Sequence, residues 1–217
     1  MTARWRALCI DVVDGGAMGA FWAAATGLVH RPGEGDPGHL DGGPEGSLVE
    51  LCAVPEPVTV KQRVHLDLHV ADVADLVAVG ATVVDDTQPW TVLTDPEGGE
   101  LCAFARDEVP AYKVYEVSVD AADPERIARW WAERFGVEAR NGGEPWWWLE
   151  GVPGAPFDSL VFGPVPEPKT VKNRIHWDVT GSVDDFLAAG ATALRDMPRW
   201  RVLADPEGNE FCVFPSD

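Results

Sequence analysis

Two long stretches of the sequence are nearly the same. Residues 54–104 and 165–214 share the opening Val-Pro-Glu-Pro, a Gly-Ala-Thr step and an Asp-Pro-Glu-Gly turn, in the same order. The two stretches begin about 110 residues apart. A period of this length is that of a globular domain, whereas solenoid repeats recur every 20–50 residues or so, roughly. The sequence therefore predicts two copies of one domain.

The parts of the chain in front of these stretches also align, since Cys9–Asp14 matches Ser118–Asp123. We therefore predict one domain over residues 1–108 and a second over residues 109–217. The join between them is short, and a short linker keeps two domains side by side. We expect the two domains to pair within the chain, and the protein to be a monomer or a homodimer.

The composition limits the classes of partner. The formal net charge is −19 at pH 7, whereas a protein that binds nucleic acid or an anionic membrane surface needs a basic patch. The chain has no run of about 20 apolar residues and starts without the layout of a signal peptide. Its four cysteines lie in apolar, strand-like runs, as free buried thiols do. We expect a cytoplasmic protein.

Each domain divides into two units with the same order of elements. Helices are predicted over residues 18–26, 73–79, 124–135 and 183–189, each after one strand and before three more. The third helix has the clearest bounds, because Asp123 can cap it, Pro124 suits its first turn and Gly136 ends it. Four β-α-β-β-β units with mostly antiparallel strands predict the α+β class.

At this point the sequence resembles the vicinal-oxygen-chelate superfamily, in its glyoxalase-like or bleomycin-resistance-like branch. The resemblance is carried by the helix entry Asp123-Pro124-Glu125-Arg126, the strand Val64-His65-Leu66-Asp67-Leu68 and the closing motif Asp205-Pro206-Glu207-Gly208-Asn209-Glu210-Phe211-Cys212. It implies that two β-α-β-β-β units form one cup-shaped sheet around a ligand site. This chain would then be a tandem repeat of two glyoxalase-like domains with two cups.

In this family, enzymes hold a divalent metal with His and Glu side chains that line the cup. Matched one by one, the ligand positions fall in the first repeat on Glu50, His65 and Cys102, and in the second on Glu116, His176 and Cys212. Phe162 is the predicted counterpart of Glu50. A nitrogen, an oxygen and a sulfur ligand together suit zinc, and nickel, iron or manganese are the other candidates. Otherwise both cysteines are small buried hydrophobic residues.

A Lys-x-Arg-x-His-x-Asp pattern ends on His65 and Asp67, and again on His176 and Asp178. Because strand side chains alternate, we expect the four polar residues of each pattern on one face of a strand. The Asp can orient the His and raise its basicity, which makes these four residues candidates for acid–base catalysis. The alternative is a cross-strand pair that holds the sheet in register. The arginines of the pattern are candidates for ligand binding: Arg63 and Arg174.

Three consecutive tryptophans, Trp146, Trp147 and Trp148, must place at least one ring on each face of a strand. One of these faces is either the cup, where aromatic rings suit flat apolar ligands, or a surface between domains. Trp90 and Trp200 occupy matching places in the two repeats and are interpreted as structural.

Together these features favour a cup that binds a small, partly aromatic metabolite or antibiotic without a tightly bound metal. The alternative is a metal-dependent lyase, isomerase or dioxygenase of the same family, in which the metal polarises a carbonyl or enolate oxygen. Glu50 favours a working cup in the first repeat and Glu116 favours one in the second, so both alternatives stay open at this stage.

Overall fold

The structure, a computed structural model, describes residues 2–215; Met1 and residues 216–217 lie outside the described part. The described chain forms four helices: α1 (Gly15–Thr26), α2 (Val73–Ala78), α3 (Pro124–Phe135) and α4 (Val183–Ala188). None of these helices has the length and apolar character needed to cross a membrane.

The strands form two sheets of eight strands each. Sheet A contains, in spatial order, β14 (Thr192–Asp196), β15 (Arg201–Ala204), β16 (Glu210–Phe214), β13 (Ile175–Thr180), β1 (Arg4–Val12), β4 (Val49–Ala53), β3 (His39–Asp41) and β2 (Val29–Arg31). Sheet B contains β10 (Ala139–Arg140), β11 (Trp147–Glu150), β12 (Ser159–Pro164), β9 (Val114–Ala121), β5 (Val64–Val70), β8 (Glu100–Ala105), β7 (Thr91–Thr94) and β6 (Thr82–Asp85).

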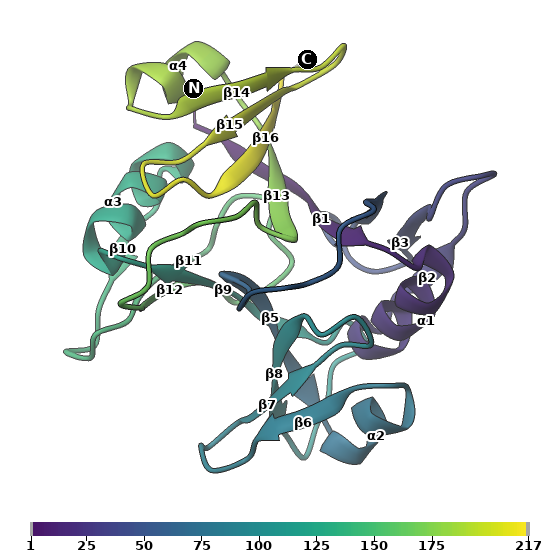
Figure 1. Cartoon of the computed structure of the whole chain (residues 1–217). Coiled ribbons are helices and arrows are strands. Elements are labelled where there is room, and N and C mark those ends of the chain that lie inside the picture. The colour runs from purple at the N-terminus through teal and green to yellow at the C-terminus, as the bar shows by residue number, and fades with distance from the viewer. Residues whose placement is uncertain (1, 216–217) are drawn as a thin grey trace.

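Each sheet takes one β-α-β-β-β unit from each repeat (Figure 1). In sheet A, β1 of the first repeat pairs in antiparallel fashion with β13 of the second. In sheet B, β5 of the first repeat pairs in the same way with β9 of the second. The predicted α+β class and the mostly antiparallel sheets of two units each are confirmed. The units that share a sheet come from different repeats, however, and the domain boundary at residue 108 stays a prediction.

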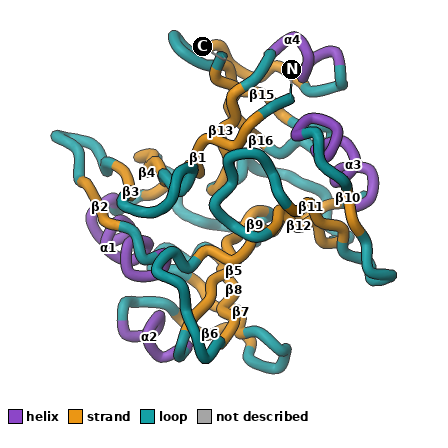
Figure 2. Tube along the Cα trace, turned by 180° about the vertical axis from the view of Figure 1, so that it is seen from behind, coloured by secondary structure: helices purple, strands orange, loops and turns teal. Residues whose placement is uncertain are grey.

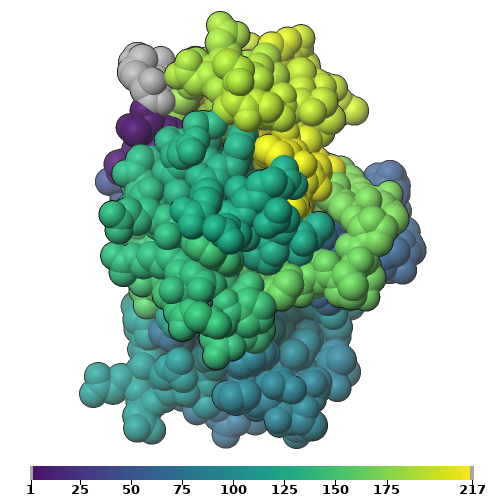
Figure 3. Space-filling view, turned by 90° about the vertical axis from the view of Figure 1, so that its left-hand side faces the viewer, coloured from purple at the N-terminus to yellow at the C-terminus, as the bar shows by residue number. Residues whose placement is uncertain are grey.

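The helices lie around the two sheets, with α1 and α3 on opposite sides of the molecule and α2 and α4 at its ends (Figure 1, Figure 2). Although α3 belongs to the unit that builds half of sheet B, its Trp131 ring lies 4.9 Å from Phe211 and 5.2 Å from Trp177 in sheet A. On this side, the green residues of the second repeat lie between the yellow C-terminal unit and the blue residues of the first repeat (Figure 3). Helix α3 therefore packs against residues of both sheets.

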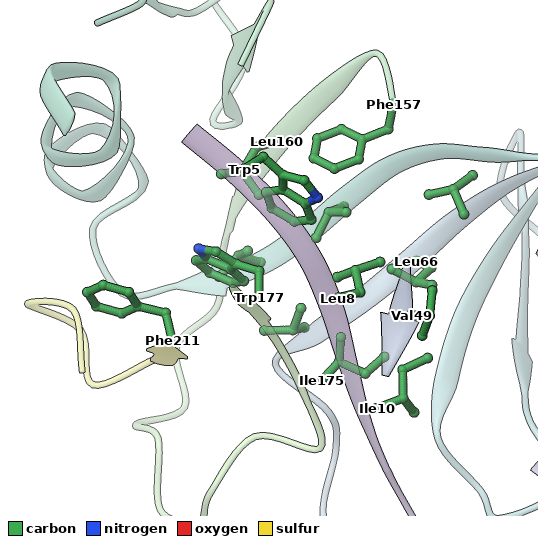
Figure 4. Packing of buried hydrophobic residues seen from close by; sticks show 14 of the residues in the cluster. Trp5, Leu8, Ile10, Val49, Leu66, Phe157, Leu160, Ile175, Trp177 and Phe211 are labelled. Carbon is green, nitrogen blue, oxygen red and sulfur yellow. The ribbon is translucent and has the colours of Figure 1, made fainter. Parts of the chain in front are cut away.

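The buried apolar side chains form one core that extends through both sheets. Figure 4 shows residues of both repeats gathered beside β1, among them Leu8, Ile175 and Leu66. Trp5 on this strand meets Phe157 edge-on with ring centroids 4.7 Å apart. Because strands from both repeats share the core, neither repeat buries its apolar surface alone.

The local sequence explains the best-predicted helix. α3 has the predicted bounds, the Asp123 side chain accepts a hydrogen bond from the backbone N–H of Arg126, and Gly136 ends the helix with a φ of 68°. That left-handed conformation favours glycine because it carries no Cβ.

The strands that carry the Lys-x-Arg-x-His-x-Asp pattern are shorter than predicted, since β5 begins at Val64 and β13 at Ile175. The lysine and arginine of each pattern precede the strand, and Lys61 forms an ion pair with Asp120 in sheet B. The predicted polar strand face therefore keeps only its His and Asp residues.

The Asp-Pro-Glu-Gly turns connect the sheets to each other. Glu97, between β7 and β8 of sheet B, accepts hydrogen bonds from the backbone N–H groups of the two residues before α1, Val13 and Asp14. Glu207, between β15 and β16 of sheet A, accepts equivalent bonds from the two residues before α3. Each acidic turn thus interacts with the positive end of a helix from the other sheet.

Asp95 opens the first of these turns and is 5% exposed. Its carboxylate accepts hydrogen bonds from the backbone N–H groups of Glu97 and Gly99, but burial raises its pKa from 3.8 to about 6. The folded protein therefore binds this proton more tightly than the unfolded chain does. The contribution of Asp95 to the free energy of unfolding rises as the pH falls from 7 through 6. It levels off below the pKa of this group in the unfolded chain.

We expect the protein to remain assembled after cleavage between the repeats. A protease site inserted between the exposed residues Asp107 and Glu108 should allow complete cleavage, yet the two pieces should elute together in size-exclusion chromatography. The reason is that each sheet and the common core contain strands from both pieces. Elution of two separate folded fragments would contradict the exchanged arrangement of the units.

We also expect Asp95 to add stability on mild acidification. Between about pH 7.5 and pH 5, the free energy of unfolding in urea should rise by on the order of 1–2 kcal/mol from Asp95 alone. Relative to the wild type, Asp95→Asn should reduce the gain in the free energy of unfolding by this amount, whereas Asp86→Asn at an exposed position should leave the gain unchanged. Equal slopes for all three proteins would contradict the raised pKa of Asp95.

Candidate functional site

The two sheets differ in the space over their central strands. Over sheet A lies an open cavity of about 2050 Å³, here called cup A, whose floor is formed by β1, β4, β13 and β16. Loop residues 54–63, 167–168 and 170–174 line its rim, and Trp200 and Phe214 line its wall. Over sheet B, here called cup B, the cavity is about 630 Å³ and lies at the side, against Tyr115, Glu116 and Trp148.

Matching positions in the two sheets explain this difference. In cup B, Tyr115 stacks on His69 with ring centroids 4.4 Å apart and meets Phe104 edge-on at 5.5 Å. The strand registers place Arg6 and Thr180 of cup A at the positions of Tyr115 and His69. Two aromatic rings that fill cup B are therefore replaced in cup A by a small side chain and by an exposed arginine.

A cluster of polar side chains lies on the floor of cup A. Donor atoms of Cys9, His176 and Asp178 lie within 4.8 Å of one another. Cys9 Sγ donates to Asp178 Oδ1 at 3.5 Å, and Cys212 Sγ lies 3.6 Å from His176 Nε2. His176 is 8% exposed, and its Nδ1 has no hydrogen-bond partner in the described part of the chain. Glu50 lines the same cavity.

Burial sets the charges in this cluster. It lowers the pKa of His176 to about 4, with help from the nearby Lys172 ammonium group, so that the imidazole is neutral at pH 7. Burial also raises the pKa of Asp178 to about 6 and that of the Cys212 thiol. The expectation that the aspartate raises the basicity of the histidine is therefore wrong for His176. A neutral imidazole can ligate a metal or accept a proton.

The matching residues of cup B behave differently. His65 Nε2 lies 3.2 Å from Asp67 Oδ1, and Ser118 Oγ donates to Asp67 Oδ2 at 2.8 Å. Burial lowers the pKa of His65, but the Asp67 carboxylate and the Cys102 thiol outweigh it and hold this pKa well above its usual range. The raised pKa favours the charged form of His65 beside Asp67, as in a structural ion pair, although donor atoms of His65, Asp67 and Cys102 also lie within 4.8 Å of one another. Cys102 lies beside His65, with its pKa raised by burial.

The possible metal ligands were predicted as one set for each repeat. This grouping is wrong, because each sheet combines one unit from each repeat. Glu50 and Cys212 lie in sheet A with His176, whereas Glu116 and Cys102 lie in sheet B with His65. The pairing of Glu50 with Phe162 is also wrong by one residue. Glu50 pairs with Cys9, and Val161 occupies the matching place beside Ser118.

The donor set of cup A fits a zinc-type ion. Bonds of 2.0–2.3 Å in a tetrahedral site place donor atoms about 3.3–3.8 Å apart. The Cys9–Asp178 distance of 3.5 Å falls in this range, and His176 offers a third donor atom within 4.8 Å of the other two. Thiol and imidazole ligands favour zinc over magnesium or calcium. Cys9 was not predicted, although strand alternation places it on one face with Asp11.

Of the residues predicted to bind ligand, the two arginines reach cup A and the tryptophans do not. Arg63 and Arg174 line its rim, where they donate to the backbone carbonyls of Glu167 and Glu56. Trp147 lies against Arg129 of α3 at 4.8 Å, Trp148 borders the small cavity of cup B, and Trp146 is 43% exposed. Trp200, interpreted from the sequence as structural, lines cup A instead.

The chain can now be placed among known proteins. Residues 7–104 and 116–214 each match the sequence profile of the glyoxalase-like domain. The chain belongs to this family. The resemblance to the vicinal-oxygen-chelate superfamily is thereby confirmed, and so is the tandem repeat.

Solved structures agree with the glyoxalase-like fold. Glyoxalase I from Zea mays is 14% identical, with a TM-score of 0.71 over 99% of this chain and 92% of the other. A putative dioxygenase from Bacillus subtilis subsp. subtilis str. 168 is 11% identical, with a TM-score of 0.67 over 98% of this chain and 84% of the other. A comparison with curated proteins finds no match. At these identities the likeness shows the fold alone.

Proposed function

We propose that this glyoxalase-like protein binds a small, partly aromatic metabolite or antibiotic in cup A. The observation that carries the proposal is the open cavity of about 2050 Å³ over sheet A, at the position where the matching side chains of sheet B fill the cup. Drug-sized ligands occupy pockets of roughly 300–1,000 Å³. Cup A therefore has room for a ligand as large as an antibiotic.

The walls of cup A suit a flat ligand. Trp200 and Phe214 are stacked, with ring centroids 5.3 Å apart and an interplanar angle of 22°. Because Arg6 lies over the ring of Phe214, the indole of Trp200 is the apolar surface for a second ring system. His176 and Asp178 on the floor supply polar atoms that can orient the ligand. Binding of this kind requires no metal.

We expect a ligand of cup A to be reported by Trp200. In a chemically diverse panel of aromatic metabolites and antibiotics, at least one compound should shift the tryptophan fluorescence saturably. At a concentration of about 100 times its Kd, that compound should stabilise the protein by roughly 2.7 kcal/mol. Trp200→Phe should remove most of the fluorescence shift, whereas Trp90→Phe at the matching place in sheet B should keep it. A panel without any saturable shift or stabilisation would contradict the proposal.

A second candidate function, metal-dependent lyase, isomerase or dioxygenase chemistry, is favoured by the cluster of Cys9, His176 and Asp178. These residues would hold the ion, and Cys212 and Glu50 lie in the same cup. Polarisation of a carbonyl or enolate oxygen is the chemistry that such an ion supplies when bound. The neutral imidazole of His176 and the buried thiol of Cys212 add no charge to the floor before binding.

This second candidate predicts one zinc site in cup A. In competition with a fluorescent chelator, the wild-type protein should bind zinc. Cys9→Ser or His176→Gln should weaken the affinity of the protein for zinc at least about tenfold, because each substitution removes a ligand. Cys9→Ser is a mild change, since serine is the residue at the matching position of cup B. His65→Gln should leave the affinity unchanged. Equal affinities for all four proteins would exclude this site.

A further inference from the structure

Cup A carries arginines where cup B has other residues. The strand registers match Arg6 to Tyr115 and Arg195 to Asp85. Arg199, one residue before Trp200, matches Pro89, one residue before Trp90. All three arginines line cup A and are exposed. The two cups share one scaffold, so these substitutions are specific to the open cup.

The balance of charge in this cup differs from that of the whole protein. The chain has 17 Lys and Arg residues against 36 Asp and Glu, whereas seven Lys and Arg residues and seven Asp and Glu residues line cup A. Solubility does not explain why these basic residues gather in the cup, because the scattered surface charges and the excess of acidic residues already keep the protein soluble. Beyond a Debye length of about 8–10 Å, the acidic surface repels an anion only weakly. Nearby arginines can therefore decide the charge of the ligand.

Arg6, Arg195 and Arg199 are available to a ligand. Most exposed arginines of the described chain pair with a carboxylate, as Arg31, Arg129 and Arg140 do. Within residues 2–215, no ion pair involves Arg6, Arg195 or Arg199. The guanidinium group of Arg6 lies over the ring of Phe214, 4.2 Å from its centroid. An arginine thus borders the same aromatic wall that a flat ligand would contact.

The carboxylates of cup A indicate where a negative group would lie. Asp11, Asp120 and Glu210 pair with lysines, whereas Glu50 and Asp178 lie on the floor and Glu56 and Glu167 lie in the rim loops. Repulsion by these carboxylates disfavours an anionic group at the floor or at the rim loops. The wall beside Trp200, with Arg6, Arg195 and Arg199, is therefore the place for one.

On the basis of the proposed function, we propose that the ligand of cup A is an anion. Its flat apolar part lies against Trp200, and its carboxylate, phosphate or sulfonate group lies among Arg6, Arg195 and Arg199. The planar guanidinium fork binds two oxygens of such a group at once, which lysine cannot do. These arginines select a charged aromatic molecule over its neutral analogue.

Two fluorescent dyes with the same aromatic frame test this selection. One is 8-anilinonaphthalene-1-sulfonate and the other is the neutral N-phenyl-1-naphthylamine. The wild type should bind the sulfonate about tenfold more tightly at low salt, and the preference should shrink as salt is added. The variant R6Q/R195Q/R199Q should bind both dyes with similar affinity.

The variant R31Q/R129Q/R140Q is the matched control. It removes the same number of charges at exposed arginines outside cup A, whose side chains are 56%, 58% and 51% exposed, and it should keep the tenfold preference. Circular dichroism of each variant verifies that it is folded. Trp200→Phe should reduce energy transfer from the protein to either dye, which places the dyes in cup A.

The outcomes separate this inference from the proposed function. Equal affinity of the wild type for the two dyes, or an unchanged preference in R6Q/R195Q/R199Q, would overturn the anion selection and leave the cup as a binding site. Failure of both dyes to bind in cup A, together with an empty ligand panel, would overturn the proposed function and this inference with it.

Discussion

The antiparallel pairing of β1 with β13, and of β5 with β9, is the constraint on which the rest of the structure depends. These two seams join units of different repeats, so that neither repeat can complete a sheet by itself. They also run through both candidate sites, since Cys9 is the register partner of His176 and Ser118 that of His65. A shift of one residue in either pairing would turn every side chain of the shifted strand to the opposite face, which would disperse the polar cluster and disrupt the core. The same pairing therefore specifies both the fold and the site.

The duplicated scaffold gives two different cups from a small number of side chains. The pairing of Trp90 with Phe104 in sheet B, at 5.8 Å, repeats that of Trp200 with Phe214 in sheet A at 5.3 Å. On this shared wall, Tyr115 extends the aromatic stack and closes cup B, whereas Arg6 covers Phe214 and leaves cup A open. The same scaffold can therefore pack a stable core with or without an open cavity over the sheet. Cup B can serve as packing between β5, β8 and β9 while cup A retains a surface for a ligand.

Much of the fold could be predicted from the sequence, because its signals are local. The cap Asp123, Pro124 and the left-handed Gly136 determine α3 within their own neighbourhood, and the shared motifs revealed the repeat. The site could be predicted only in part. His176 and Asp178 follow from strand alternation, but their proximity to Cys9 depends on the register of strands more than 160 residues apart, roughly, which no local pattern records. The ligand sets were therefore assigned by repeat, and Trp200 was interpreted as structural although it lines the cavity.

The electrostatics of cup A connect the floor to the wall. Burial keeps His176 neutral and raises the pKa of Asp178 to about 6, while Lys172 forms an ion pair with Asp11. With a pKa of about 6, Asp178 is mostly ionised at pH 7, so the floor keeps a negative charge beside the neutral imidazole. The unpaired arginines beside Trp200 supply the positive potential in the cavity, since water and salt screen the distant acidic surface. The floor is therefore suited to an uncharged part of a ligand, and the wall with Arg6, Arg195 and Arg199 to its charged part. This division gives the ligand one orientation in the cup, with its charged end toward these arginines, whether the floor binds it alone or together with a metal ion.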